Sequence, residues 1–207
     1  CIRDRDQAEF RKVNLVGDDM FPYRTAFGFL TDSGQYQKCL DVGLAAIGYD
    51  TFKQEQEEAR KRGKLLGIGI STMTEPLGAG NSREYDIIGI KMFDSAELRV
   101  HMTGKALLRT GAKSQGQGLE TTWSQIVAHE LGIPAEDIVV EEGDTDSAPF
   151  GMGTYASRST PVAGAAVAMV SRKIRAKARK IAAHLLEVSE EDIEWELGRF
   201  YVRGNEE

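Results

Sequence analysis

The sequence has few cysteines, few histidines and no long apolar run. Cys1 and Cys39 are its only cysteines, which excludes a disulfide framework and a four-thiolate zinc site. His101, His129 and His184 stand far apart and lack the short spacings of histidine metal ligands. No apolar run approaches the roughly 20 residues that a transmembrane helix requires. We therefore expect no metal ligands, no transmembrane segment and a reducing compartment such as the cytoplasm.

A net basic charge is also absent. The chain has 26 basic and 32 acidic residues, a net charge of −6, which argues against binding to nucleic acid through its phosphates. Residues 172–180 hold six of the basic residues, but the apolar positions between them continue a helical stripe. These charges are therefore expected on a solvated helix face. The G-x-S-x-G and G-x-x-x-x-G-K-[ST] motifs are missing, and no set of catalytic residues is predicted.

Apolar periodicity predicts a mixed fold in two parts. Residues 1–63 form a mostly helical N-terminal segment, and residues 64–207 form an α/β segment. Helices are predicted over 35–49, 51–62, 119–131 and from Pro161 onward, with Thr160 as N-cap and an apolar stripe from Val167 to Val188. Strands are predicted over 65–70, 95–101, 106–110 and 137–142, followed by a hairpin over 193–202. The class is α/β or α+β, with a mixed sheet.

Glycine is abundant, at 22 of 207 residues, and one glycine-rich loop lies between a predicted strand and a predicted helix. Gly116 and Gly118 allow the backbone of this loop to approach a ligand closely. Gln115 and Gln117 each offer a side-chain amide that both donates and accepts hydrogen bonds. The N–H groups at the start of the following helix point back at the loop, so an anion or a polar ring fits there.

A second loop, over residues 151–161, leads into the long helix and has similar ingredients. It contains glycines, hydroxyl side chains and one arginine, of which we single out Ser157, Arg158, Ser159 and Thr160. Hydroxyls, backbone N–H groups and arginine are the groups that bind phosphate. Arg158 has an alternative role as the ion-pair partner of a nearby carboxylate such as Asp144 or Asp146. Two such loops in one chain favour a nucleotide or a phosphorylated cofactor.

Three longer strings make these loops recognisable. Residues 111–118, 138–146 and 153–166 resemble the molybdopterin-binding subunit of the xanthine dehydrogenase/aldehyde oxidase family. Together with residues 27–29 and 92–95, they are most similar to the aerobic carbon monoxide dehydrogenase branch of that family. The similarity extends over nearly all 207 residues. It implies that the two loops hold molybdopterin cytosine dinucleotide, the organic part of a molybdenum cofactor.

The resemblance also implies a larger enzyme around this chain. Such an enzyme oxidises the small molecule carbon monoxide to carbon dioxide and passes electrons to iron–sulfur and flavin subunits, in the cytoplasm or on the inner face of the membrane. Its copper-ligating cysteine loop and its acid/base glutamate are not found in this sequence. The chain begins with Cys1 rather than Met, and we expect it to be an internal segment that is inactive by itself.

Two alternatives stay open. Leu119 follows the Gln-Gly-Gln-Gly string, where the carbon monoxide branch often has His and the xanthine-type enzymes have Leu. In the first alternative, the parent protein is a molybdenum hydroxylase that acts on an aldehyde or an N-heterocycle. The other alternative is a structural remnant that binds no cofactor.

Overall fold

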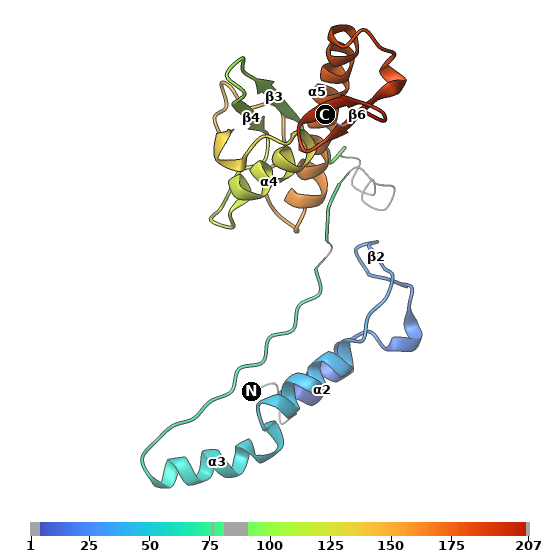
Figure 1. The fold of residues 1–207 in the computed structure, drawn as a ribbon. Coiled ribbons are helices and arrows are strands. Elements are labelled where there is room, and N and C mark those ends of the chain that lie inside the picture. The colour runs from blue at the N-terminus through green and yellow to red at the C-terminus, as the bar shows by residue number, and fades with distance from the viewer. Residues whose placement is uncertain (1–4, 76, 81–90, 206–207) are drawn as a thin grey trace. The chain divides into compact units, whose positions relative to one another are not determined.

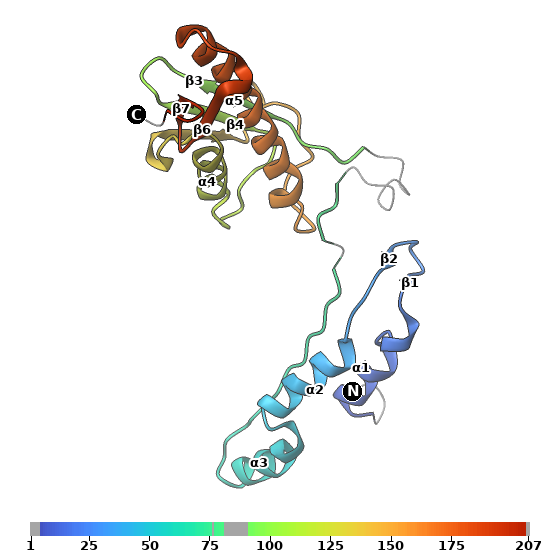
Figure 2. The same ribbon diagram turned by 45° about the vertical axis from the view of Figure 1, so that its right-hand side comes forward.

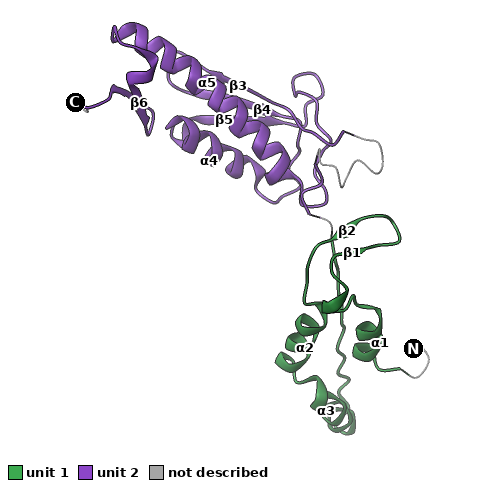
Figure 3. Ribbon diagram, turned by 90° about the vertical axis from the view of Figure 1, so that its right-hand side faces the viewer, with its two compact units in different colours: residues 1–75 green, residues 76–207 purple. Residues whose placement is uncertain are grey.

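The computed structural model describes residues 5–75, 77–80 and 91–205, which belong to two compact units (Figure 1). Unit 1 comprises residues 1–75 and unit 2 comprises residues 76–207, as Figure 3 shows in separate colours. The units therefore divide after Glu75. The division of the chain after residue 63 into functional segments stays a prediction.

Unit 1 consists mainly of helices. Its elements are α1 (Gln7–Asn14), a 3-10 turn (Asp18–Met20), β1 (Tyr23–Arg24), β2 (Leu30–Thr31), α2 (Tyr36–Ala46) and α3 (Tyr49–Lys61). The two helices predicted in this region are confirmed as α2 and α3. Asp6 caps α1, because its carboxylate accepts hydrogen bonds from the backbone N–H groups of Ala8 and Glu9. The same carboxylate accepts a hydrogen bond of 3.0 Å from the Tyr49 hydroxyl, which joins α1 to the start of α3.

The strand predicted over residues 65–70 is wrong. This segment is extended, but none of the described residues pairs with it as a strand. The Gln56 side chain donates to the Leu66 carbonyl at 2.9 Å, and the Arg11 guanidinium donates to the Ile70 carbonyl. A strand requires a neighbouring ladder of backbone hydrogen bonds, and here side chains of helices bind two of the carbonyls instead.

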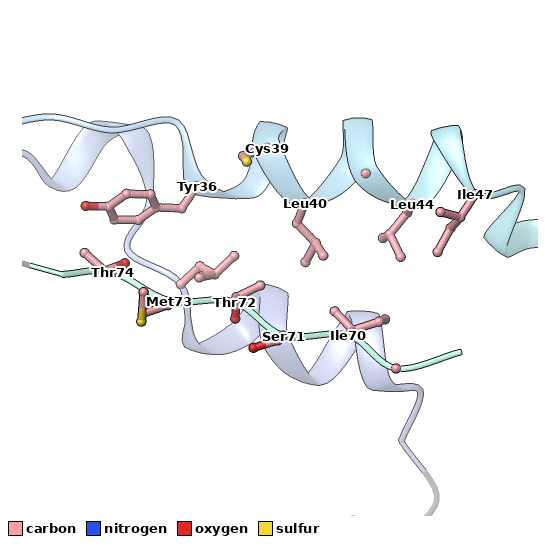
Figure 4. A pocket seen from close by; sticks show the side chains of 13 residues that line it. Tyr36, Cys39, Leu40, Leu44, Ile47, Ile70, Ser71, Thr72, Met73 and Thr74 are labelled. Carbon is pink, nitrogen blue, oxygen red and sulfur yellow. The ribbon is translucent and has the colours of Figure 1, made fainter. Parts of the chain in front are cut away.

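An apolar groove lies between α2 and the extended segment (Figure 4). One side of the groove is lined by Tyr36, Leu40 and Leu44 of α2 and by Ile47, which follows the helix, and the other side is lined by residues 69–74. Its volume is about 480 Å³, and none of its described lining residues carries a charge. It therefore offers no cation to pair with the charge of a phosphorylated ligand.

Unit 2 contains a three-stranded mixed sheet, as predicted. Its strands are β3 (Ala96–Val100), β4 (Ala106–Thr110) and β5 (Ile138–Glu142). The middle strand β4 pairs with β3 antiparallel and with β5 parallel. Helix α4 (Leu119–Leu131) connects β4 to β5, and α5 (Gly164–Leu185) is followed by the hairpin of β6 (Ile193–Glu196) and β7 (Arg199–Val202).

The core of unit 2 lies between the sheet and its two long helices. Helices α4 and α5 pack against each other and lie on the same face of the sheet, which Figure 2 shows. The core contains fully buried apolar side chains from all three elements: Leu108 of β4, Trp123 and Val127 of α4, and Val167 of α5. The burial of each such side chain stabilises the folded state by about 1.5–3 kcal/mol. This packing holds the carboxyl ends of β4 and β5 at one edge of the sheet.

The start of the long helix differs from the prediction. A π-helical turn (Ser159–Ala163) precedes α5, and Arg158 rather than Thr160 stands at its N-cap position without a side-chain capping bond. Pro161 lies inside this turn, where its missing N–H cannot join a regular α-helical ladder. The Gly164 N–H donates to the Ser159 carbonyl, five residues back, and this bond makes the turn π-helical.

The apolar stripe predicted along α5 is buried only over its first half. Val167 is fully buried against α4, but Ile181 is 53% exposed and Leu185 is 74% exposed. The helix has 22 residues and is about 33 Å long, so it extends past the sheet. The hairpin β6–β7 covers part of this extension, and Arg175 lies over the ring of Trp195 at 4.5 Å.

Gly111 and Gly151 allow two backbones to touch beside the sheet. A Cβ atom added to Gly111 lies 2.5 Å from the Cα atom of Gly151. We predict that Gly111→Ala lowers the free energy of unfolding of unit 2 by about 1–3 kcal/mol, because two backbones cannot shift as a flexible side chain can. Urea unfolding followed by tryptophan fluorescence measures this, since Trp123 and Trp195 both lie in unit 2.

Gly43→Ala is the control for this substitution. A Cβ atom at Gly43 meets nothing within 4 Å, and the residue lies in unit 1. The tryptophan transition of this variant should equal that of the parent chain. An unchanged transition in Gly111→Ala as well contradicts the prediction.

Candidate cofactor-binding site

The structure brings the two glycine-rich loops together at the carboxyl edge of the sheet. The first loop (residues 111–118) follows β4, and the second loop (residues 151–161) comes after the turn that follows β5. The Gln115 amide nitrogen donates to the Thr154 carbonyl at 3.3 Å, and the Thr154 hydroxyl donates to the Lys113 carbonyl at 2.6 Å. The Ser159 hydroxyl lies 3.1 Å from the Thr154 hydroxyl. Thr154, which we did not select from the sequence, thus joins the loops.

The first loop presents an open backbone surface. Gly116 has a φ angle of +101° and Gly118 has one of +77°, and residues with a side chain rarely adopt such values. A Cβ atom at either glycine meets nothing within 4 Å, so another molecule can approach the backbone there. Gln115 and Gln117 are exposed, and the Gln117 side-chain oxygen accepts a hydrogen bond of 2.5 Å from the Gln115 N–H. This bond orients the Gln117 amide.

Carboxylates surround the start of α4 beside the first loop. The side chain of Glu142 is only 3% exposed and accepts a hydrogen bond of 2.7 Å from the Ser114 N–H. The pKa of Glu120 is lowered by a hydrogen bond from its own backbone N–H, although desolvation opposes the shift. A hollow of about 530 Å³ lies here, lined mainly by charged residues: Arg109, Lys113, Glu120, Glu141, Glu142 and Asp144. The four carboxylates of this lining outnumber its two cations, so the hollow repels anions. The first loop therefore suits a polar ring with N–H groups better than a phosphate.

The second loop presents hydroxyls but not its arginine. Ser157 and Thr160 are exposed, whereas Ser159 and Arg158 are buried. The Arg158 side chain is 0% exposed and forms an ion pair of 2.6 Å with Asp94. Its guanidinium also donates to four backbone carbonyls: those of Ala79, Met92, Phe93 and Gly153. The donors of Arg158 are thus directed at protein oxygens.

The acidic turn after β5 is not the partner of Arg158. The Asp144 carboxylate instead accepts hydrogen bonds from the Asp146 N–H at 2.9 Å and from the Ser147 hydroxyl at 3.0 Å. These bonds, the Asp146 N–H first, lower the pKa of Asp144. The ion-pair role that the sequence left open for Arg158 is therefore correct in kind, but its partner is Asp94. Asp94 lies far from the loop in the sequence, and although residues 92–95 carry part of the family resemblance, they gave no indication of an ion pair with Arg158.

The lowered pKa of Asp144 predicts a pH-dependent contribution to stability. A carboxylate whose pKa is lower in the folded protein stabilises the fold above its unfolded pKa of about 3.9, and this stabilisation is lost as the pH falls through the folded pKa. Asp144→Asn should therefore lower the melting temperature at pH 7, and the difference from the parent should shrink below about pH 4. Thermal unfolding of both proteins at pH 7 and at pH 3 measures this difference in melting temperature. A difference that is equal at both pH values contradicts the prediction.

Leu119 belongs to the core rather than to the site surface. Its side chain is 3% exposed and packs in the cluster that contains Trp123. In this chain its side chain therefore contributes to packing. Among the described residues, no group of three His, Cys, Asp or Glu side chains is arranged to hold a metal ion. No helix in the same part of the chain combines the length and the apolar character that a membrane crossing requires.

The fold and the paired loops define a class of protein. Residues 43–207 match the molybdopterin cofactor-binding domain family, and the chain belongs to this family. It is also 54% identical to the carbon monoxide dehydrogenase large chain of Hydrogenophaga pseudoflava, over 97% of this chain and 25% of that protein.

Solved structures show the same similarity. A Cu,Mo-CO dehydrogenase in its carbon monoxide-reduced state is 53% identical, with a TM-score of 0.67, over 97% of this chain and 26% of that one. Quinoline 2-oxidoreductase from Pseudomonas putida is 36% identical, with a TM-score of 0.69, over 95% and 25% of the two chains. The chain thus spans about a quarter of the length of these relatives.

Proposed function

We propose that this chain is part of the large subunit of an aerobic carbon monoxide dehydrogenase. The parent enzyme oxidises carbon monoxide with water to carbon dioxide, and two electrons and two protons are released. The electrons pass to the iron–sulfur and flavin subunits of the same enzyme. The observation that carries the proposal is the junction of the two loops through Thr154, in a chain that is 54% identical to a carbon monoxide dehydrogenase large chain.

The residues of both loops fit molybdopterin cytosine dinucleotide, and they divide its binding by charge. Gln115 and Gln117 bind the N–H edge of a ring, while the backbones of Gly116 and Gly118 leave room for it. The carboxylates beside this loop favour the same edge. When bound, the cofactor supplies the redox chemistry at molybdenum, and the protein supplies binding and orientation.

The second loop supplies donors for the phosphates of the dinucleotide. The hydroxyls of Ser157 and Thr160 are exposed, and Ser159 lies next to them and holds Thr154. The N-terminal end of α5 adds a favourable dipole contribution of about 0.3–1 kcal/mol for a bound anion. Arg158 acts through the loop backbone rather than by direct contact. The copper ligand of the intact enzyme lies outside this chain.

A molybdenum hydroxylase for an N-heterocycle or an aldehyde is the second candidate. The TM-scores to the carbon monoxide enzyme and to quinoline 2-oxidoreductase are nearly equal, so the fold of this segment serves both reactions. The sequence identities of 53% and 36% favour the carbon monoxide enzyme.

Substrate oxidation by the complete enzyme distinguishes the two candidates. We expect the purified enzyme that contains this chain to reduce an electron-accepting dye when carbon monoxide is supplied, and not when quinoline or an aldehyde is supplied. Dye reduction is followed by absorbance under anaerobic conditions. Turnover of quinoline or an aldehyde without turnover of carbon monoxide contradicts the proposal in favour of the hydroxylase.

The open space at Gly116 predicts a loss of cofactor on substitution. Gly116→Val places a side chain where the ring approaches, so we expect the complete enzyme to lose most of its molybdenum, measured by elemental analysis. Gly104→Val is a matched control, because Gly104 also has a positive φ, of +87°, and open space around its Cβ position. The control, in the turn between β3 and β4, carries similar backbone strain away from both loops and should keep its molybdenum. Equal molybdenum contents in both variants contradict the role of Gly116.

A further inference from the structure

We propose that Asp94 is a positioning residue for the second loop. Through Arg158, it holds residues 152–158 in the conformation that presents Ser157 and Thr160 to the dinucleotide. This inference rests on the proposed function, because it concerns the same site. Asp94 lies before β3 and belongs to neither glycine-rich loop.

Asp94 contacts the second loop at two points. Its Oδ1 atom accepts a hydrogen bond of 2.9 Å from the Met152 N–H, and its Oδ2 atom lies 2.6 Å from Nη1 of Arg158. The side chains of both members of the pair are 0% exposed. In such surroundings the charge of either residue is compensated only by its partner and by nearby dipoles. The start and the end of the loop are therefore both fixed to one carboxylate.

Arg158 extends this connection to a third segment. Its Nε atom donates to the Ala79 carbonyl at 2.8 Å, and its Nη1 atom donates to the Gly153 carbonyl at 2.7 Å. Its guanidinium also lies over the Tyr155 ring, 5.3 Å from the ring centre. A planar guanidinium with five donors can join this many acceptors, whereas a lysine ammonium cannot.

The loop that this pair holds has an unfavourable backbone. Ala156 and Ser157 are consecutive residues in the left-handed region, with φ angles of +47° and +48°, although neither is glycine. Such conformations persist only where surrounding contacts determine them, and they cluster at ligand-binding sites. The Gly78 N–H donates to the Ala156 carbonyl at 3.1 Å and supports the same turn. The conformation sets the direction of Ser157, which carries one of the exposed hydroxyls.

A second buried carboxylate offers a comparison. Glu130 lies near the C-terminal end of α4, with its side chain 7% exposed, and it pairs with Arg172 at 2.7 Å and with Arg175 at 3.2 Å. This cluster joins α4 to α5 and makes no contact with Asp94 or Arg158 in the described part of the chain. Removing its charge shows what the loss of a buried ion pair does when the contacts of Asp94 and Arg158 are left intact.

The test measures the cytosine nucleotide that acid releases from the complete enzyme, per large subunit, together with the melting temperature. We expect Asp94→Asn and Glu130→Gln both to lower the melting temperature. Only Asp94→Asn should lose nucleotide, so that its content per large subunit falls well below that of the parent enzyme and of Glu130→Gln. Arg158→Lys keeps a positive charge beside Asp94 but not the fork of donors, and it should lose nucleotide as well. It serves as the test should Asp94→Asn not fold.

Relief of the backbone strain provides a rescue. Ala156→Gly removes the cost of the left-handed conformation at that residue, so in the Asp94→Asn background it should restore part of the nucleotide content. A gain in stability alone restores nucleotide content only in step with the melting temperature, so recovery of nucleotide beyond that of the melting temperature supports the positioning role and parallel recovery contradicts it. If the parent enzyme contains nucleotide and Asp94→Asn retains as much as Glu130→Gln, the positioning role is overturned. If the parent enzyme contains no nucleotide, the proposed function is overturned, and this inference with it.

Discussion

The parallel pairing of β4 with β5 is the constraint on which the site depends. Thr110 lies opposite Glu142 at the ends of these strands, so the segments that follow them leave the sheet at one edge. Ligands of α/β proteins bind at such carboxyl edges. Helix α4 makes the parallel pairing possible, because it returns the chain across the face of the sheet. Its Trp123 and Val127 are fully buried, and this burial holds the helix in place.

Charge divides the edge into two regions. Around the first loop, Glu120 and Glu142 make the start of α4 unsuited to phosphate, although a helix N-terminus alone attracts anions. Around the second loop, the one arginine is withdrawn into the interior, and exposed hydroxyls and the start of the long helix take its place. A dinucleotide with a ring at one end and phosphates in its middle matches this division.

Elements with a strong local signal were predictable. Helices α2, α3 and α4 follow from apolar residues at helical spacing, and β3 and β4 follow from alternation around the turn at Gly104. The segment over 65–70 has the composition of a strand but no partner among the described residues, and composition cannot supply a partner. The first turn before α5 was misjudged because Thr160 and Pro161 resemble a regular helix start, whereas the chain forms a π turn over Ser159–Ala163. The apolar stripe of α5 was predicted from its periodicity, but periodicity does not show where the sheet ends, and only the first half of the stripe is buried.

The sequence by itself determined the fold class, the two candidate loops and the family, because glycine spacing, hydroxyl clusters and apolar periodicity are local properties. It also determined the kinds of group at the site, amides in one loop and hydroxyls in the other. Only the tertiary structure decided that Thr154 joins the loops, that Leu119 is a core residue and that Arg158 binds Asp94 instead of facing a ligand. Asp94 and Arg158 are 64 residues apart, and the distance between two such residues is set by packing around a common core rather than by any local pattern.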